Sequence, residues 1–405
     1  MTERADLPLD GIVVVALEQA VAAPIATRHL ADLGAEVIKV ERVGEGDFCR
    51  NYDDAVRGMA SHFVWLNRGK RSIELDLKDP RGQKVLGELI SRADVLVQNL
   101  APGATQRLGL DPEALISEQP RLIVAGISGY GLEGPYAEHK AYDMLIQAES
   151  GLISVTGTPE TPTKTGIPTS DIAAGVYVAQ AVLAALFRRE RTGKGGVIDV
   201  AMLDATAEWL GHQINMQMYA DRQVPRMGLS HAAIAPYDAY PTQDGQILIG
   251  VQNDRGWEQL TRDVFDRPDL TSRSDLATNP LRVANRAETD RVVSDETRKW
   301  TTSDLTERLN AVGIPAAQIN DLKGLVAHPQ LTARDRWRPI DSPVGQLSAL
   351  LPPMTFQDVE LPMGSVPALG EDSASILADL GYDDAAIATL AAIGVIGSRN
   401  SRRSP

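Results

Sequence analysis

Hydrophobic and polar positions in the N-terminal half of the chain alternate between short β-branched runs and longer stretches of helical period. A continuous apolar run such as GIVVVAL (11–17) predicts a buried parallel strand, and the apolar spacing of PIATRHLADLG (24–34) predicts a helix. Further strands are expected at 36–42, 72–78, 94–100, 122–129 and 195–203, and further helices at 79–93 and 176–193. This βαβα order predicts an α/β fold with a parallel sheet covered by helices on both faces.

The pattern changes in the second half of the chain. DRQVPRMGLS (221–230) is typical of a loop, and DGQILIGV (244–251) begins a region of mixed strands and helices. A chain of 405 residues exceeds the usual size of a single hydrophobic core. We therefore predict a large Rossmann-like domain from 1–215 and 330–405 and a smaller α+β domain over 222–325, with linkers near 216–221 and 326–329.

Composition argues against several classes of protein. The formal net charge of −14 disfavours nucleic acid and anionic membrane surfaces as partners. Cys49 is the single cysteine and the six histidines are scattered, so we expect no disulfide and no metal site. No apolar run of membrane-spanning length and no signal-like N-terminus is recognisable, and a cytoplasmic protein is expected.

Two common enzyme motifs are missing. The segment after the first strand, EQAVAAP (18–24), lacks the GxGxxG glycines of a dinucleotide-binding loop. The chain has no GxSxG motif, which argues against a serine hydrolase triad.

Basic residues follow several predicted strands. Each one alone is more often a solvated surface charge than a ligand contact. In open α/β sheets, however, ligands bind at the carboxyl ends of the strands. Their joint position in an acidic protein predicts a site for a small polyanion such as coenzyme A (CoA). The residues are Arg42, Arg68, Lys70, Arg71, Arg107, His139 and Lys140.

Asp171 stands before the long apolar helix, in the segment GIPTSDIAAG. An aspartate at a helix start is commonly a cap. Next to small residues such as Ala173 and Gly175, which let a bulky substrate approach, it is also a candidate nucleophile. Tyr142 and Asp143 precede another predicted helix, where Asp143 is either a cap or a hydrogen-bonding group that orients Asp171.

Six segments between about residue 8 and residue 215 occur in a recognisable order: DLGAEVIKVERVGEGD, LNRGKRSIELDLKDPRG, ADVLVQNLAPGATQRLGL, KAYDMLIQAESGLISVTG, SDIAAG and RTGKGGVIDVAMLDA. Together they resemble the class III CoA-transferases, which include formyl-CoA transferase and carnitine CoA-transferase. The resemblance continues through SHAAIAPYDAYPTQDG, HPQLTARDRW and LGEDSASILADLGY. It covers nearly the whole chain.

The resemblance implies a site and an assembly. Asp171 matches the family's nucleophile, and Gln19, Tyr142 and Asp143 are possible supporting residues, with the N–H of Gln19 or Ala20 as an oxyanion donor. It further implies two ring-like subunits interlocked as a homodimer, CoA as a substrate, and no prosthetic group. The positions implied to contact CoA are Ala20, Val21, Ala22, Arg42, Lys70, Asn99, Leu100, Arg107, Leu108 and Lys140.

The implied reaction moves CoA from an acyl-CoA such as succinyl-CoA to a small acid through an aspartyl-CoA thioester. The branch resembled takes C4–C5 dicarboxylates such as mesaconate, itaconate, citramalate or malate, and Arg28, Arg50 and His231 are candidates for the second carboxylate. The family's glycine-rich loop is replaced here by GLSHAAIAPY (228–237). Two alternatives are an α-methylacyl-CoA racemase, disfavoured by Tyr142 where a histidine is needed, and a non-catalytic acyl-CoA-binding subunit.

Overall fold

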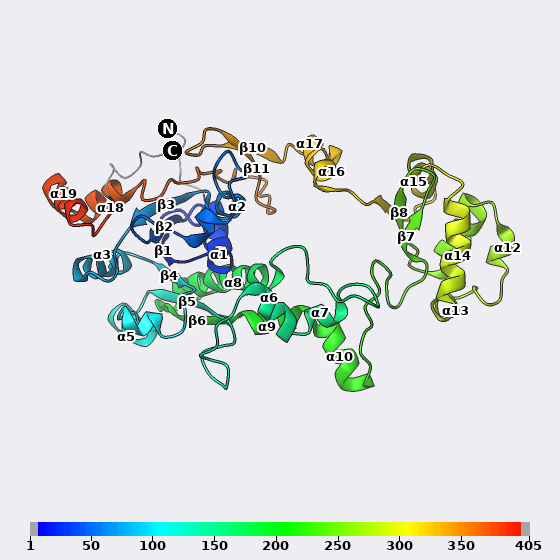
Figure 1. Ribbon diagram of the computed structural model, residues 1–405, viewed down its shortest axis with the longest axis horizontal. Coiled ribbons are helices and arrows are strands. Elements are labelled where there is room, and N and C mark those ends of the chain that lie inside the picture. Colours follow the sequence, from blue (N-terminus) through cyan, green and yellow to red (C-terminus); the bar gives the residue numbers. More distant parts are fainter. Residues whose placement is uncertain (1–6, 398–405) are drawn as a thin grey trace. The chain divides into compact units, whose positions relative to one another are not determined.

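The computed structural model describes residues 7–397, which form two compact units (Figure 1). The first unit contains the chain up to Leu152, Thr165–Gly211 and the chain from Ala333 onward. The second contains Ile153–Lys164 and His212–Thr332. Segment 153–164, predicted within the large domain, groups with the second unit because Gly228 donates to the Gly157 carbonyl (2.8 Å) and Arg226 Nε to that of Thr158 (3.0 Å).

The first unit is built on a six-stranded parallel sheet of order β3-β2-β1-β4-β5-β6. All the predicted strands are present, although β3 starts earlier and ends sooner than the pattern indicated. The strands are β1 (Val13–Leu17), β2 (Glu36–Glu41), β3 (Lys70–Glu74), β4 (Val95–Gln98), β5 (Ile123–Ser128) and β6 (Gly196–Ala201). The strand order reverses between the adjacent strands β1 and β4, because the chain continues from β1 to β2 on one side and from β4 to β5 on the other. Open α/β sheets bind ligands at such a strand-order reversal.

Helices cover both faces of this sheet, as predicted. On one face, α1 (Ala22–Asp32), α8 (Thr169–Thr192) and α9 (Met202–Trp209) share a core with β1, β4 and β5. On the other face, α3 (Pro80–Ser91) packs with α18 (Ser373–Leu380) and α19 (Asp384–Ala392) from the C-terminal part of the chain. The remaining elements of this unit are the 3₁₀ turn Phe48–Asn51, α2 (Ser61–Asn67), α4 (Ala104–Arg107), α5 (Pro112–Glu118), α6 (Asp143–Glu149), β10 (Trp337–Ile340) and β11 (Leu347–Leu350).

The second unit has a three-stranded antiparallel sheet of β7 (Tyr237–Pro241), β8 (Gln246–Gly250) and β9 (Ala316–Gln318). Its core centres on Trp257, Leu260 and Leu305. Short helices surround the sheet: α11 (Asp254–Gln259), a π-helical turn (Leu260–Val264), α12 (Pro268–Thr271), α13 (Asn279–Ala284), α14 (Arg286–Thr297), α15 (Thr302–Ala311) and α16 (Leu322–Val326). Three helices lie across the boundaries between the units: α7 (Leu152–Val155), α10 (Gly211–Ala220) and α17 (Pro329–Ala333).

Helix α8 begins earlier than the apolar pattern predicted, because the polar residues of TSD already form its first turn. It ends as predicted, with Gly193 in the left-handed conformation after a basic last turn. Among the described residues it is the one helix long and apolar enough to cross a membrane. Its contacts with α1, α9, β5 and β6 identify it as a core helix of the first unit.

Helices α8 and α1 approach each other at Gly175. A Cβ atom there would lie 2.2 Å from Ile25 Cγ2 and 2.4 Å from the Ala22 carbonyl oxygen. We expect Gly175→Ala to lower the free energy of unfolding by about 1–3 kcal/mol, the usual cost of overpacking. Gly87 in α3 has no atom within 4 Å of such a Cβ, so Gly87→Ala should instead raise it by about 0.5–1 kcal/mol. Urea unfolding measures both, and a Gly175→Ala protein as stable as the parent would contradict the close approach.

Candidate active site

Asp171 lies in the first turn of α8 but does not cap it. The N-cap residue is Pro168, and no side chain of the helix's own start accepts a capping hydrogen bond. The carboxylate that does so comes from α6: Asp143 Oδ1 accepts from the backbone N–H of Ser170 (2.8 Å) and of Asp171 (3.3 Å). The capping role considered for Asp171 therefore belongs to Asp143, and the partly exposed Asp171 carboxylate remains available for chemistry.

Asp143 is held in this position by a buried amide. Gln147 Nε2 donates to Asp143 Oδ2 (2.7 Å), while Gln147 Oε1 accepts from the backbone and hydroxyl of Thr165 (3.0 and 3.1 Å). Burial and the neighbouring Asp143 charge together raise the pKa of Asp171 to about 7. Tyr142 is the exposed N-cap residue of α6 and makes no side-chain capping bond.

The loops after β1 and β4 meet at the carboxyl edge of the sheet. Asn99 binds Gln19 through both groups of its amide: Oδ1 accepts from the Gln19 N–H (2.9 Å) and Nδ2 donates to the Gln19 carbonyl (2.9 Å). This pair fixes Gln19 and, next to it, the predicted CoA contacts Ala20 and Val21. The structure thus brings these positions together with Asn99 at the strand-order reversal, where open α/β sheets bind ligands.

The segment Gln19–Ala22, which we call the Ala20 loop, lies against the first turn of α8. Ile172, the residue after Asp171, packs on a small cluster of Val21, Ile25 and Leu66. The close contact of Gly175 with α1 holds the two helix starts together one turn further on. The nucleophile candidate and the Ala20 loop therefore share one site within the first unit.

The predicted oxyanion donors differ from those the geometry offers. The N–H of Gln19 is bound by Asn99, and that of Ala20 by Asp47 Oδ1 (3.0 Å). Within residues 7–397, no acceptor takes the N–H groups of Val21 and Ala22 at the start of α1. These two amides, with the positive end of the α1 dipole behind them, are the available donors.

The basic residues picked from the sequence divide into two groups. Arg42, His139 and Lys140 are exposed on loops after β2 and β5, and Arg107 is exposed at the end of α4, which follows β4. A ligand phosphate can reach all four residues. Arg68 and Arg71 instead pair with acidic side chains of the first unit.

Lys70 is buried and makes three hydrogen bonds, to Glu18 (2.7 Å), the Pro24 carbonyl (2.9 Å) and Asn67 (3.0 Å). All three of its donors are in use, so in this arrangement its ammonium has none left for a phosphate. The charge pattern selected Lys70 because a sequence does not reveal burial.

The other predicted residues are less informative. Leu100 and Leu108 are partly buried against the core under α3. Arg50 binds both oxygens of Glu41 (2.8 and 2.7 Å), so it is not a free cation for a substrate carboxylate. Arg28 is buried, and its Nε lies 3.9 Å from Asp32 without a hydrogen-bond partner in the part of the chain that the structure describes.

A family model described as CoA-transferase family III matches residues 9–373. The chain belongs to this family. It is 35% identical over 395 residues to human succinyl-CoA:glutarate CoA-transferase, covering 96% of this chain and 90% of that protein. It is 33% identical over 387 residues to succinyl-CoA:mesaconate CoA-transferase of Haloarcula hispanica, covering 92% of this chain and 96% of that protein. A crystal structure of a CAIB/BAIF family protein from Brucella suis is 37% identical, with a TM-score of 0.83 and coverage of 93% of this chain and 100% of that one.

These similarities confirm the class III CoA-transferase predicted from the sequence and its α/β fold. The family match covers the whole second unit and most of the first. Within the described residues no group of three or more histidine, cysteine or acidic side chains is arranged to hold a metal ion.

Proposed function

We propose that this CoA-transferase moves CoA from succinyl-CoA to a small dicarboxylic acid through a covalent thioester on Asp171. The observation that carries the proposal is the position of Asp171 in the first turn of α8: it does not cap the helix, it is partly exposed, and it lies beside the Ala20 loop. No other carboxylate of the first unit combines a raised pKa near 7 with this place at the strand-order reversal, among the residues described.

The proposed reaction balances without a redox step. The Asp171 carboxylate attacks the thioester carbonyl of the donor, which gives a mixed anhydride and CoA thiolate. The thiolate then attacks the Asp171 carbonyl, forming the aspartyl-CoA thioester and releasing the donor acid. The acceptor carboxylate reverses the two steps and leaves one of its oxygens in the regenerated Asp171 carboxylate.

Each tetrahedral intermediate places a negative charge on a carbonyl oxygen. The free N–H groups of Val21 and Ala22 at the start of α1 are suited to stabilise such a charge. Arg42, Arg107 and Lys140 are proposed to hold the phosphates of CoA, with Ala20, Asn99, Leu100 and Leu108 along the rest of the molecule. We further propose a cytoplasmic homodimer.

The acceptor is proposed to be a C4–C5 dicarboxylate. The two relatives named above carry glutarate and mesaconate in their names, and both acids are C5 dicarboxylates. Purified protein should transfer CoA from succinyl-CoA to at least one member of a panel of glutarate, mesaconate, itaconate, citramalate and malate, as measured by chromatography of the acyl-CoA products. Oxalate, a C2 diacid, is the control for chain length. A C5 monocarboxylate is the control for the second carboxylate.

The same incubations separate the alternatives. A transferase exchanges label between free succinate and succinyl-CoA, whereas a racemase epimerises a 2-methylacyl-CoA and a binding subunit does neither. Epimerisation without label exchange would replace the proposal with the racemase. Exchange with succinate but with none of the other diacids would remove the acceptor class and leave the transferase.

A further inference from the structure

Ala20 has a backbone conformation that an alanine rarely adopts. Its φ is +60°, in the left-handed region, where a residue with a Cβ is strained by about 1–2 kcal/mol. Ala20 sits between Gln19, which Asn99 holds at the sheet edge, and Val21, where α1 begins. A strained residue persists only where its surroundings hold it, and such residues cluster at active sites. The question is what holds Ala20.

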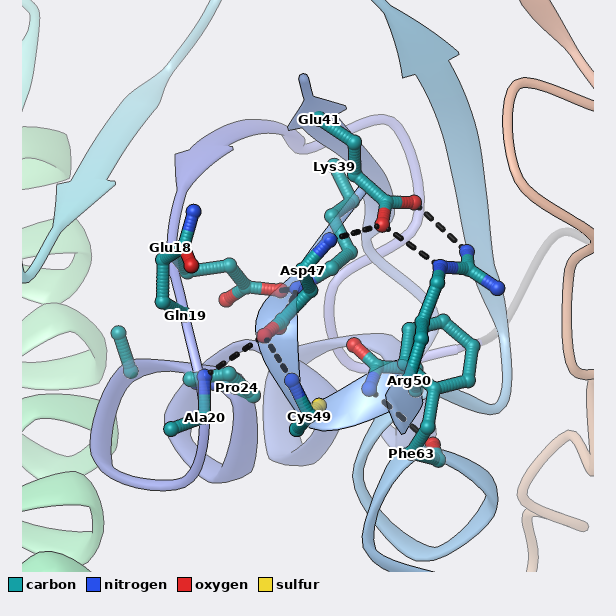
Figure 2. A network of polar contacts seen from close by, with 12 residues as sticks. Glu18, Gln19, Ala20, Pro24, Lys39, Glu41, Asp47, Cys49, Arg50 and Phe63 are labelled. Carbon is teal, nitrogen blue, oxygen red and sulfur yellow. Dashed lines mark hydrogen bonds and ion pairs between the residues drawn. The ribbon is translucent and has the colours of Figure 1, made fainter. Parts of the chain in front are cut away.

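Asp47 supplies that hold (Figure 2). Its Oδ1 accepts from the backbone N–H of Ala20 (3.0 Å) and of Cys49 (3.0 Å), and its Oδ2 accepts from Lys39 Nζ (2.8 Å). The Asp47 side chain is fully buried, so water does not compete for these bonds. A carboxylate from the loop after β2 thus fixes a strained residue of the loop after β1.

Asp47 is kept ionised by a balanced group of buried charges. Lys39 also donates to Glu18 Oε1 (3.2 Å), and Glu18 accepts from Lys70 (2.7 Å). Two lysines thereby face two carboxylates, and the pKa values of Asp47 and Glu18 are held below their ordinary ones despite burial. The buried ammonium of Lys39 thus holds one oxygen of Asp47 while the other oxygen holds Ala20.

The backbone of Asp47 is fixed as well. Its N–H donates to Glu41 Oε2 (2.9 Å), and Glu41 also binds Arg50 and the hydroxyl of Ser72 (2.7 Å). The same Ser72 hydroxyl accepts from the N–H of Gly370 (2.8 Å), in the C-terminal segment. Figure 2 shows Asp47 between Ala20 and the pair of Glu41 and Arg50.

We propose that Asp47 is a positioning residue for CoA transfer. By holding Ala20 in its strained conformation, it aims the free N–H groups of Val21 and Ala22 at the oxyanion that forms beside Asp171. This inference rests on the proposed function. In this proposal Asp47 touches neither CoA nor the acid and acts on the rate through its hydrogen bond to the Ala20 N–H.

If Asp47 only stabilised the fold, its replacement would have a different effect from the loss of a positioning residue. Buried ion pairs are weak evidence for net stability, and removing one partner destabilises any fold because it leaves a charge unpaired. Stability loss alone therefore says nothing about positioning. The two roles separate in kcat, because displacing transition-state donors lowers kcat, whereas partial unfolding lowers only the amount of active enzyme.

The experiment compares Asp47→Ala and Asp47→Asn with Asp94→Asn as the matched control. Asp94 accepts from a backbone N–H of β1 and pairs with the buried Arg189 (2.9 Å), but at the amino edge of the sheet, away from the site. With kcat referred to folded protein, we expect a loss of about 10- to 100-fold for Asp47→Ala with KM for succinyl-CoA within about threefold. Asp47→Asn, which keeps an acceptor for Ala20, should fall between, and Asp94→Asn should keep the parental kcat.

A rescue variant makes the test independent of folding losses. Glycine adopts a φ of +60° without strain, so Ala20→Gly in the Asp47→Ala background should recover most of the lost kcat. The Ala20→Gly single variant gives the reference value. Parental kcat in both Asp47 variants, or no recovery of kcat in the double variant, would overturn the positioning role. In that case, label exchange by the parent protein would still support the proposed transferase activity. Should the parent exchange no label, both proposals are overturned.

Discussion

Asp171→Asn is expected to reduce CoA transfer by at least about 1,000-fold, because an amide cannot form the anhydride and no second carboxylate takes its place. The variant should fold and still bind CoA, since Asp171 makes no capping bond that the fold depends on. Transfer is measured by label exchange and CoA binding by calorimetry. Asp204→Asn is a matched control: Asp204 lies in the first turn of α9, is exposed, and should be replaceable without loss of rate.

Two further measurements identify the bond that forms. In the parent protein, an acceptor acid labelled with a heavy oxygen isotope should leave label in the peptide that contains Asp171, and borohydride should trap the thioester there. Transfer by Asp171→Asn within about tenfold of the parent, or label on another carboxylate, would contradict the assignment. Loss of CoA binding together with transfer would instead place Asp171 in the binding site only.

The fold was predictable because its signals are local. Continuous apolar runs such as GIVVVAL read directly as buried parallel strands, and the glycine and basic last turn fixed the end of α8. The start of α8 was missed because TSD is polar and also reads as a cap. Whether such residues are outside or inside a first turn depends on a contact from elsewhere, here Asp143 on α6.

Site residues could be predicted in two ways: from the resemblance to the class III CoA-transferases, and from the loops that follow the predicted strands. Asn99 and the Ala20 loop meet as expected, because parallel strands end at one edge. Lys70 was predicted to contact CoA, but it is buried against Glu18, and the sequence alone does not distinguish a buried lysine from one on the surface. Asp47 left no signal, because its role depends on a bond to Ala20, 27 residues earlier in the chain. Gln147 lies one helical turn after Asp143, but its other bonds go to Thr165, 18 residues further on, and the sequence does not show that contact.

The pH dependence of transfer should report the pKa of Asp171. Burial first, and the Asp143 charge second, raise that pKa to about 7. Because the carboxylate is the nucleophile, kcat/KM for succinyl-CoA should rise with pH through about 7 in the parent protein. Asp143→Asn removes the like charge, so the rising limb should move to lower pH. Asp199→Asn is the control, since Asp199 also has a raised pKa but lies on β6.

Stability supplies an independent reading of the same pKa. A carboxyl whose pKa is raised on folding binds its proton more tightly in the native state, so its contribution to stability is present below its ordinary pKa of 3.8 and is lost as pH rises through about 7. Asp171→Asn lacks this loss and should unfold at higher urea concentration than the parent at pH 8, with the difference disappearing near pH 4. Equal urea midpoints for Asp171→Asn and the parent at pH 8 would contradict the raised pKa of Asp171. An unchanged pH profile of kcat/KM in Asp143→Asn would contradict the contribution of the Asp143 charge to it.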